Sequence, residues 1–80
     1  MEEWKKKLVL NPGEILRMEK HDRKGTVREM HIWQYSIVNS AGETVGTVHH
    51  EEHTAYRGFK RTQEVIQKDA DGKIIVNERW

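Results

Sequence analysis

The chain has 80 residues and a mass of 9.5 kDa, which is enough for one domain and leaves no room for separate cofactor and substrate domains. Charged residues make up 34% of the chain and apolar residues 35%, the formal net charge is +1, and the lack of cysteine excludes disulfides and thiolate metal sites. The longest apolar runs have three residues, far short of the roughly 20 that a membrane span requires.

The supply of apolar side chains limits the size of any core. A chain of this length buries little apolar area relative to the conformational entropy that folding costs, and such chains usually add disulfides, a metal or a partner subunit. Because the sequence has no cysteine, a homodimer is a reasonable expectation. The lack of cysteine is also compatible with a reducing compartment.

The N-terminus, Met1-Glu2-Glu3-Trp4, has neither the basic region nor the apolar stretch of a secretory signal. We therefore expect a cytoplasmic protein that makes no contact with a membrane. We expect one domain over residues 1–80 and treat residues 1–3 as a candidate disordered end.

Turn signals divide the chain at near-regular intervals. Residues 11–13, 22–25, 39–42 and 69–72 each place Asn or Asp ahead of a Gly. Asx side chains hydrogen-bond to the backbone within turns, and Gly supplies the positive φ that a tight hairpin requires. The spacing predicts antiparallel hairpins, and the last two turns, 30 residues apart, form a faint pseudo-repeat.

The stretch after Asn11 fits two structures. As a helix it has Asn11 as N-cap, Pro12 at the first helical position and Glu14 three residues after the cap. As a strand it has a turn at Pro12-Gly13 followed by an extended run over residues 14–20. The strand is favoured, because the apolar positions of this run would give a helix too narrow a stripe.

Residues 31–38 predict a central strand, because β-branched and aromatic side chains alternate over both of its faces. An apolar set on both faces indicates a strand that is covered on both sides or paired with a partner chain. Trp33, Tyr35 and Ile37 share one face, and Met30, Ile32 and Val38 lie on the other.

We expect three further strands, at residues 44–50, 59–68 and 73–80. We also consider a short helical turn at residues 51–57. The expected fold is mainly β. It is a single small antiparallel sheet or a small barrel of five to six hairpin-connected strands, with room for one short helix.

Histidines gather in the acidic middle of the chain, where residues 29–55 contain four Glu and no Lys or Arg. His49, Glu52 and His53 match the H-x-x-E-H pattern of zinc peptidases, which requires a helix, a third ligand and a cleft. On a strand, His49, Glu51 and His53 would share a face instead. We therefore expect no metal and no cofactor, and keep a His-rich metal- or pH-responsive site as a second alternative function.

A second cluster interleaves aromatic and basic residues, the combination that stacks on bases and neutralises phosphates. It consists of Tyr56, Arg57, Phe59, Lys60 and Arg61. The ordinary interpretation places the two rings in the core and the cations in solvent. Nucleic-acid binding through this stretch is the first alternative function.

No nucleophile in a recognisable setting and no Gly-rich phosphate loop occurs in the sequence, so we expect no enzymatic activity. The expected function is a small non-catalytic binding module that associates with and modulates a protein partner, and that self-associates. Binding energy concentrates in Trp, Tyr and Arg. The candidate partner-binding residues are Trp4, Trp33, Tyr35, Tyr56, Arg57 and Trp80, with a core role as the equal alternative for Trp33 and Tyr35.

Overall fold

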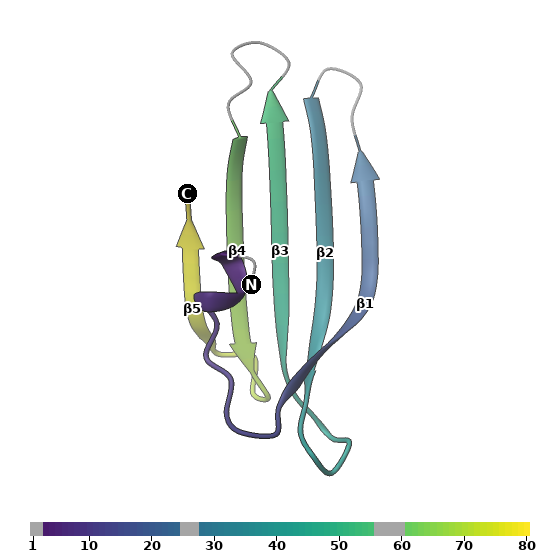
Figure 1. Ribbon diagram of the computed structural model, residues 1–80, viewed down its shortest axis with the longest axis vertical. Coiled ribbons are helices and arrows are strands. Elements are labelled where there is room, and N and C mark those ends of the chain that lie inside the picture. Colours follow the sequence, from purple (N-terminus) through teal and green to yellow (C-terminus); the bar gives the residue numbers. More distant parts are fainter. Residues whose placement is uncertain (1–2, 25–27, 56–60) are drawn as a thin grey trace.

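Five antiparallel strands form one open sheet in the computed structural model, which describes residues 3–24, 28–55 and 61–80 (Figure 1). Each strand pairs with the next along the chain, so β1 and β5 are the edges of a simple meander. The elements are α1 (Glu3–Lys6), β1 (Ile15–Lys24), β2 (Arg28–Val38), β3 (Thr44–Ala55), β4 (Arg61–Asp69) and β5 (Ile74–Arg79). The predicted mainly β fold is confirmed, as an open sheet.

The turns at residues 39–42 and 69–72 use the same construction, which explains the pseudo-repeat. Gly42 and Gly72 have φ of 81° and 84°, a conformation that L side chains rarely adopt. The side-chain oxygens of Asn39 and Asp69 each accept hydrogen bonds from the backbone N–H groups two and four residues later, at 2.9–3.0 Å. The Asx-plus-Gly signal in the sequence therefore identified both hairpins correctly.

The stretch after Asn11 is a turn followed by a strand, as favoured from the sequence. Gly13 has φ of 84°, and β1 begins at Ile15. Glu14 still makes the hydrogen bond that suggested a capping box, because its Oε1 accepts from the Asn11 N–H at 2.7 Å. The bond closes a tight turn instead of starting a helix.

The helical turn considered for residues 51–57 is wrong over the part that the structure describes. Residues 51–55 belong to β3, where they pair with β2 on one side, and residues 51–54 pair with β4 on the other. Cross-strand hydrogen bonding on both sides fixes this segment in an extended conformation. Residues 56 and 57 lie outside the described ranges. Within the described ranges a short helix is found at the other end of the chain instead, as α1.

The core lies between the N-terminal segment and one face of the sheet, here called the inner face (Figure 1). Trp4 of α1 packs there on the strand residues Ile37, Val48 and Val65, and all four are at most 4% exposed. The opposite, outer face is crossed by none of the described segments. Its apolar side chains therefore have no second layer from the described segments.

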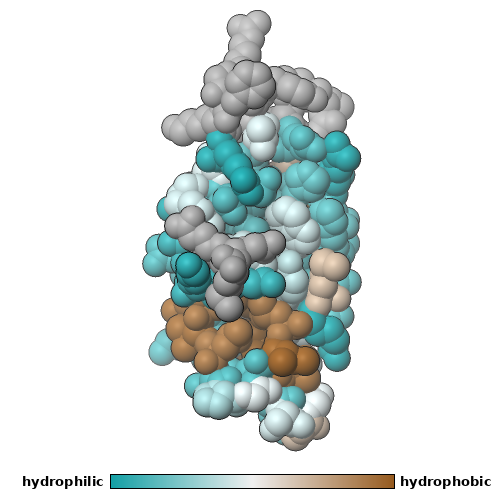
Figure 2. All heavy atoms as spheres, in the orientation of Figure 1, coloured by the Kyte–Doolittle hydropathy of each residue, from teal (hydrophilic) through white to brown (hydrophobic). Residues whose placement is uncertain are grey.

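Gln67 ties the N-terminal segment to the inner face. Its side chain is 2% exposed, donates from Nε2 to the Val9 carbonyl at 2.7 Å and accepts from the Val9 N–H at 2.8 Å. Val9 and Leu10 themselves point their side chains toward solvent. Figure 2 shows apolar side chains gathered toward this end of the inner face.

Three bulges shape the described part of the sheet. In β3 the extra residue is Val45, which turns toward the inner-face core. The edge strands carry the other two, at Glu19 in β1 and Ile75 in β5. None of the helical residues in the described ranges belongs to a helix long and apolar enough to cross a bilayer.

Candidate functional site

A column of stacked rings crosses the inner face. The strand register places His21 of β1, Trp33 of β2 and His50 of β3 directly beside one another. The ring centroids of His21 and Trp33 are 4.9 Å apart, and those of Trp33 and His50 are also 4.9 Å apart. These separations match the spacing of adjacent strands, so the ladder itself sets the stack.

Trp4 closes one end of this column. Its ring stacks on His50 with centroids 4.6 Å apart and tilts against Tyr35 at 5.2 Å. His50 is 4% exposed, and its Nε2 lies 3.1 Å from Oε1 of Gln63, so the buried imidazole has a polar partner. The column therefore joins α1 to three strands through ring contacts.

Trp80 lies at the side of the column, 6.5 Å from His50 between centroids. Its backbone exchanges two hydrogen bonds with Gln63 and so extends the β4–β5 pairing. The ammonium of Lys7 sits 4.8 Å from the Trp80 ring centroid, in cation–π range. Among the described residues, the buried Trp80 Nε1 has no hydrogen-bond partner.

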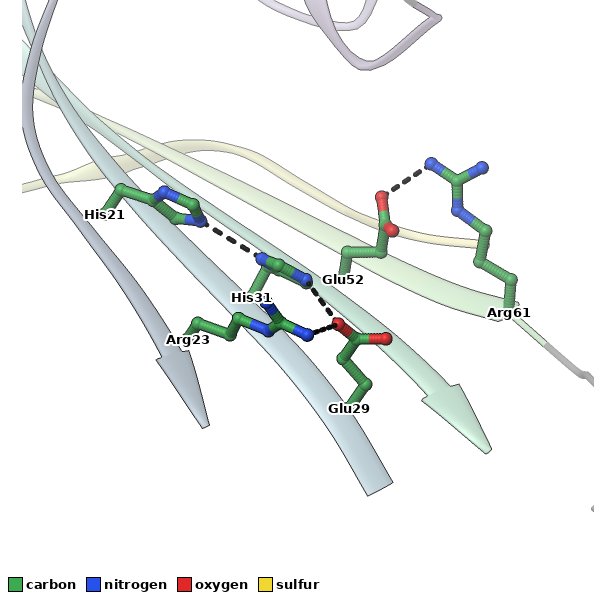
Figure 3. A network of polar contacts seen from close by, with 6 residues as sticks. All are labelled: His21, Arg23, Glu29, His31, Glu52 and Arg61. Atoms are coloured by element: carbon green, nitrogen blue, oxygen red, sulfur yellow. Dashed lines mark hydrogen bonds and ion pairs between the residues drawn. The ribbon is translucent and has the colours of Figure 1, made fainter. Parts of the chain in front are cut away.

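The other end of the column carries a linear polar network (Figure 3). Nε2 of His21 and Nδ1 of His31 are 3.1 Å apart, and Nε2 of His31 is 3.3 Å from Oε1 of Glu29. An Nη atom of Arg23 is 2.7 Å from the same Glu29 oxygen. Trp33 lies parallel to both imidazoles, at 4.9 and 5.4 Å between centroids.

A hollow of about 360 Å³ opens beside the column on the same face. Glu52 of β3 and Arg61 of β4 line this hollow and form an ion pair, with Arg61 Nη2 and Glu52 Oε2 2.5 Å apart. The Glu52 side chain is 20% exposed and the Arg61 side chain is 59% exposed. The full lining is Trp4, Trp33, Tyr35, His50, Glu52, Arg61 and Gln63.

Four of the six predicted partner-binding residues meet on this one face. Trp4 is a core residue with 4% exposure, while Trp33, Tyr35 and Trp80 are partly buried around it. Their rings contact one another or His50, so much of their apolar area is used inside the chain. Tyr56 and Arg57 lie outside the described residues.

The predicted nucleic-acid stretch is described only at Arg61, whose guanidinium is bound to Glu52. Tyr56, Arg57, Phe59 and Lys60 lie outside the described ranges. On the inner face, both sides of the Trp33 ring are occupied, by His21 on one strand and His50 on the other. A nucleobase therefore has no free face of Trp33 on which to stack.

The H-x-x-E-H residues do not converge, because β3 alternates them between the two faces. Glu52 is on the inner face with Arg61. His49 and His53 are on the outer face with Glu51 between them, at 3.3 and 3.8 Å from its carboxylate oxygens. Within the described ranges, no three His, Cys, Asp or Glu side chains are arranged to hold a metal ion.

The outer face holds the larger hollow, about 570 Å³, across β1 to β4. Arg17 and the Ser36 hydroxyl hydrogen-bond to Glu19 and hold the pKa of that carboxyl below its usual range. Hydrogen bonding and charge from Glu64 raise the pKa of Arg79. The lining is Glu19, Gln34, Tyr35, Ser36, Thr47, Val48, His49, Glu51, Glu64, Ile66 and Lys68.

Sequence reasoning missed the two arrangements that organise the inner face. Gln67 is a polar residue in a strand, and nothing in its neighbourhood points to Val9, 58 residues away. His21 and His31 lie ten residues apart around the 22–25 turn signal. The 22–25 turn signal predicts a hairpin, and a first strand extended to Lys24 would have placed the two histidines close together across it.

Comparison of this chain with protein-family models, with curated proteins and with solved structures finds no match.

Proposed function

We propose that the protein is a small non-catalytic binding module that associates with a protein partner through the outer face of its sheet, and that its first partner is a second copy of the chain. One observation carries the proposal: the described chain covers one face of the sheet and leaves the other uncovered. A sheet with apolar side chains on both faces is normally one layer of at least two.

The outer face carries apolar side chains on β1, β2, β4 and β5. Ile32 and Ile66 are partly buried among their neighbours on β2 and β4. Ile15 at one edge is 63% exposed and Ile74 at the other is 50% exposed. A second sheet packing at about 10 Å would bury these side chains between two layers.

The surface area supports a partner of this size. The chain exposes 5866 Å², about 800 Å² more than the roughly 5,050 Å² typical of a compact protein of 9.5 kDa. An interface of standard size buries about 800 Å² on each partner. One docked copy would bury an area of this size.

The outer-face carboxylates already have partners within the chain, so docking would not leave a buried carboxylate unpaired. Glu19 contacts Arg17, and Glu64 contacts Arg79 at 2.5 Å. Glu51 lies between His49 and His53. Polar side chains between these pairs, among them Gln34 and Thr47, supply further hydrogen-bonding groups.

The edges of the sheet are poorer docking sites than its face. Both edge strands contain a bulge, at Glu19 and at Ile75, which disturbs the row of free backbone groups. Six of the ten residues of β1 are charged, a further device against strand addition. The proposal therefore places the partner on the outer face. We propose the cytosol as the compartment, since the fold holds without disulfides.

Sedimentation velocity over a dilution series tests the proposal. We expect the wild type to dimerise and Ile66→Glu to be monomeric with an unchanged circular dichroism spectrum, because the substitution places an unpaired charge in the interface. Met18→Glu is the matched control, on an exposed inner-face position of β1. A wild type that stays monomeric at all concentrations, or an Ile66→Glu variant that dimerises as the wild type does, contradicts the proposal.

A further inference from the structure

The imidazoles of His21 and His31 meet edge to edge. Their centroids are 5.3 Å apart, about the nitrogen–nitrogen distance of 3.1 Å plus the two ring radii, and their planes differ by 19°. The two nitrogens therefore face each other in nearly one plane. They are about as far apart as two nitrogen ligands of a tetrahedral ion with bonds of about 2.0–2.1 Å.

The residues behind His31 match the outer shell of a histidine metal ligand. A ligating imidazole normally donates its second N–H to a carboxylate, which fixes its tautomer and raises its basicity. Nε2 of His31 lies 3.3 Å from Oε1 of Glu29, which leaves Nδ1 as the nitrogen with a lone pair. Arg23 in turn contacts that Glu29 oxygen at 2.7 Å.

The surroundings suit a divalent cation. His31 lies opposite Glu52 in the β2–β3 register, so a second carboxylate stands on the same face. The nearby charges of Glu29 and Glu52 are matched by Arg23 and Arg61, so no net positive charge repels the ion. The two rings also lie nearly parallel to Trp33, at 4.9 and 5.4 Å between centroids.

We infer that His21 and His31 form a two-histidine site for a divalent transition-metal ion, bound through Nε2 of His21 and Nδ1 of His31. No third ligand is arranged for it among the described residues, so water or a bound molecule completes the coordination. Binding requires His21 to carry its proton on Nδ1, so that Nε2 offers a lone pair. The two nitrogens face each other along the line of the ring centroids, so binding also requires the rings to turn until both lone pairs point at one ion. His21 is exposed on an edge strand, which allows both changes.

The ligand set selects the kind of ion. Two neutral imidazoles with open positions suit Cu²⁺, Ni²⁺ and Zn²⁺, and Cu²⁺ binds most tightly in the usual order of divalent ions. Ca²⁺ and Mg²⁺ prefer oxygen ligands and should not bind. The bound ion would cross-link β1 to β2 next to Trp33.

Calorimetric titration of the full chain with NiCl₂ and with CuSO₄ at neutral pH tests the inference. We expect one ion per chain, and His21→Gln or His31→Gln should weaken binding at least about 10-fold, the scale of one lost ligand of about 1.4 kcal/mol. Glu29→Gln should weaken it by about 10-fold through loss of the outer-shell carboxylate. Cu²⁺ should also quench the fluorescence of Trp33, and the variants that bind the ion more weakly should show less quenching. Comparison with Trp33→Phe identifies the part of the signal that comes from Trp33.

The outer-face histidines provide the matched control. His49→Gln with His53→Gln removes the same number of imidazoles from the cluster that the sequence pattern singled out, and should leave the affinity unchanged. Circular dichroism of each variant establishes that it is folded. The inference is overturned if no heat of binding is seen, if His21→Gln binds as the wild type does, or if the outer-face double variant loses the ion.

Discussion

The side-chain amide of Gln67 bonds to both backbone polar groups of Val9, at 2.7 and 2.8 Å, and so replaces the partner strand that Val9 lacks. Gln67 is 2% exposed, and its amide is used on both sides. A polar residue at the centre of a small core is tolerated here because its hydrogen bonds are satisfied. The N-terminal segment thereby becomes the second layer over the inner face.

We predict that Gln67→Leu destabilises the protein by about 1–3 kcal/mol, the usual range when hydrogen bonds to a buried group are lost at constant volume. The N-terminal segment should loosen first, because Val9 has no other anchor of this kind in the described chain. Urea unfolding measures the loss. Gln34→Leu, on the outer face, should change the unfolding free energy much less, and an equal effect of both variants would refute the role given to Gln67.

Gly46 is required by the close approach of β3 to β4. A Cβ at this position would stand 2.6 Å from the Lys68 carbonyl oxygen and 3.2 Å from Cδ1 of Ile37. The clash involves backbone, so Gly46→Ala should cost about 1–3 kcal/mol through displaced strands. Thr47→Ala, one residue further on, serves as the comparison in thermal unfolding. Equal melting temperatures for the two variants would show that the strands are free to separate at Gly46.

Trp4 is the largest side chain in the core, and its removal should be the most damaging single truncation. Trp4→Ala should cost about 3–5 kcal/mol, the range for a buried aromatic residue. A loss of that size is comparable to the whole free energy of unfolding of a small domain. Chemical unfolding of Trp4→Ala and Trp4→Phe measures it. The Phe variant should keep the stack on His50 and retain most of the stability, whereas two equally stable variants would place Trp4 outside the core.

Glu19 gives the outer face a weak dependence on acid. Hydrogen bonds from Arg17 and from Ser36 lower the pKa of the Glu19 carboxyl in the folded state. A lowered pKa means that this contribution to stability is present above the ordinary glutamate pKa of about 4.3 and is lost as the pH falls through the folded value. Glu19→Gln should therefore show a smaller loss of stability than the wild type between neutral pH and pH 3. An unchanged acid profile would remove Glu19 as a contributor.

The strands and turns were largely predictable because their causes are local. The Asx and Gly residues of the 39–42 and 69–72 turns act within a few residues, and the alternation at Trp33, Tyr35 and Ile37 follows from the strand period. The extension of β3 through residues 51–55 was missed, since it depends on pairing with β2 and β4. Propensity within that segment carries no information about its partners.

The inner-face site was only partly predictable for the same reason. Trp4, Trp33 and Trp80 stood out by residue type, but the histidines between them are polar residues without a local pattern. His21 and His50 join the ring column through the registers of β1 with β2 and of β2 with β3. A one-residue shift in either register would move these rings to the other face, so the site depends on pairing that one sequence does not display.

The most direct test of the outer face as the binding surface is residue-resolved NMR of the wild type over a dilution series. The account predicts that the amide signals of outer-face positions such as Ser36, Thr47 and Ile66 shift with concentration, while those of Val9 and Gln67 stay constant. Shifts confined to the inner face or to the edges β1 and β5, or spectra identical at every concentration, would contradict it.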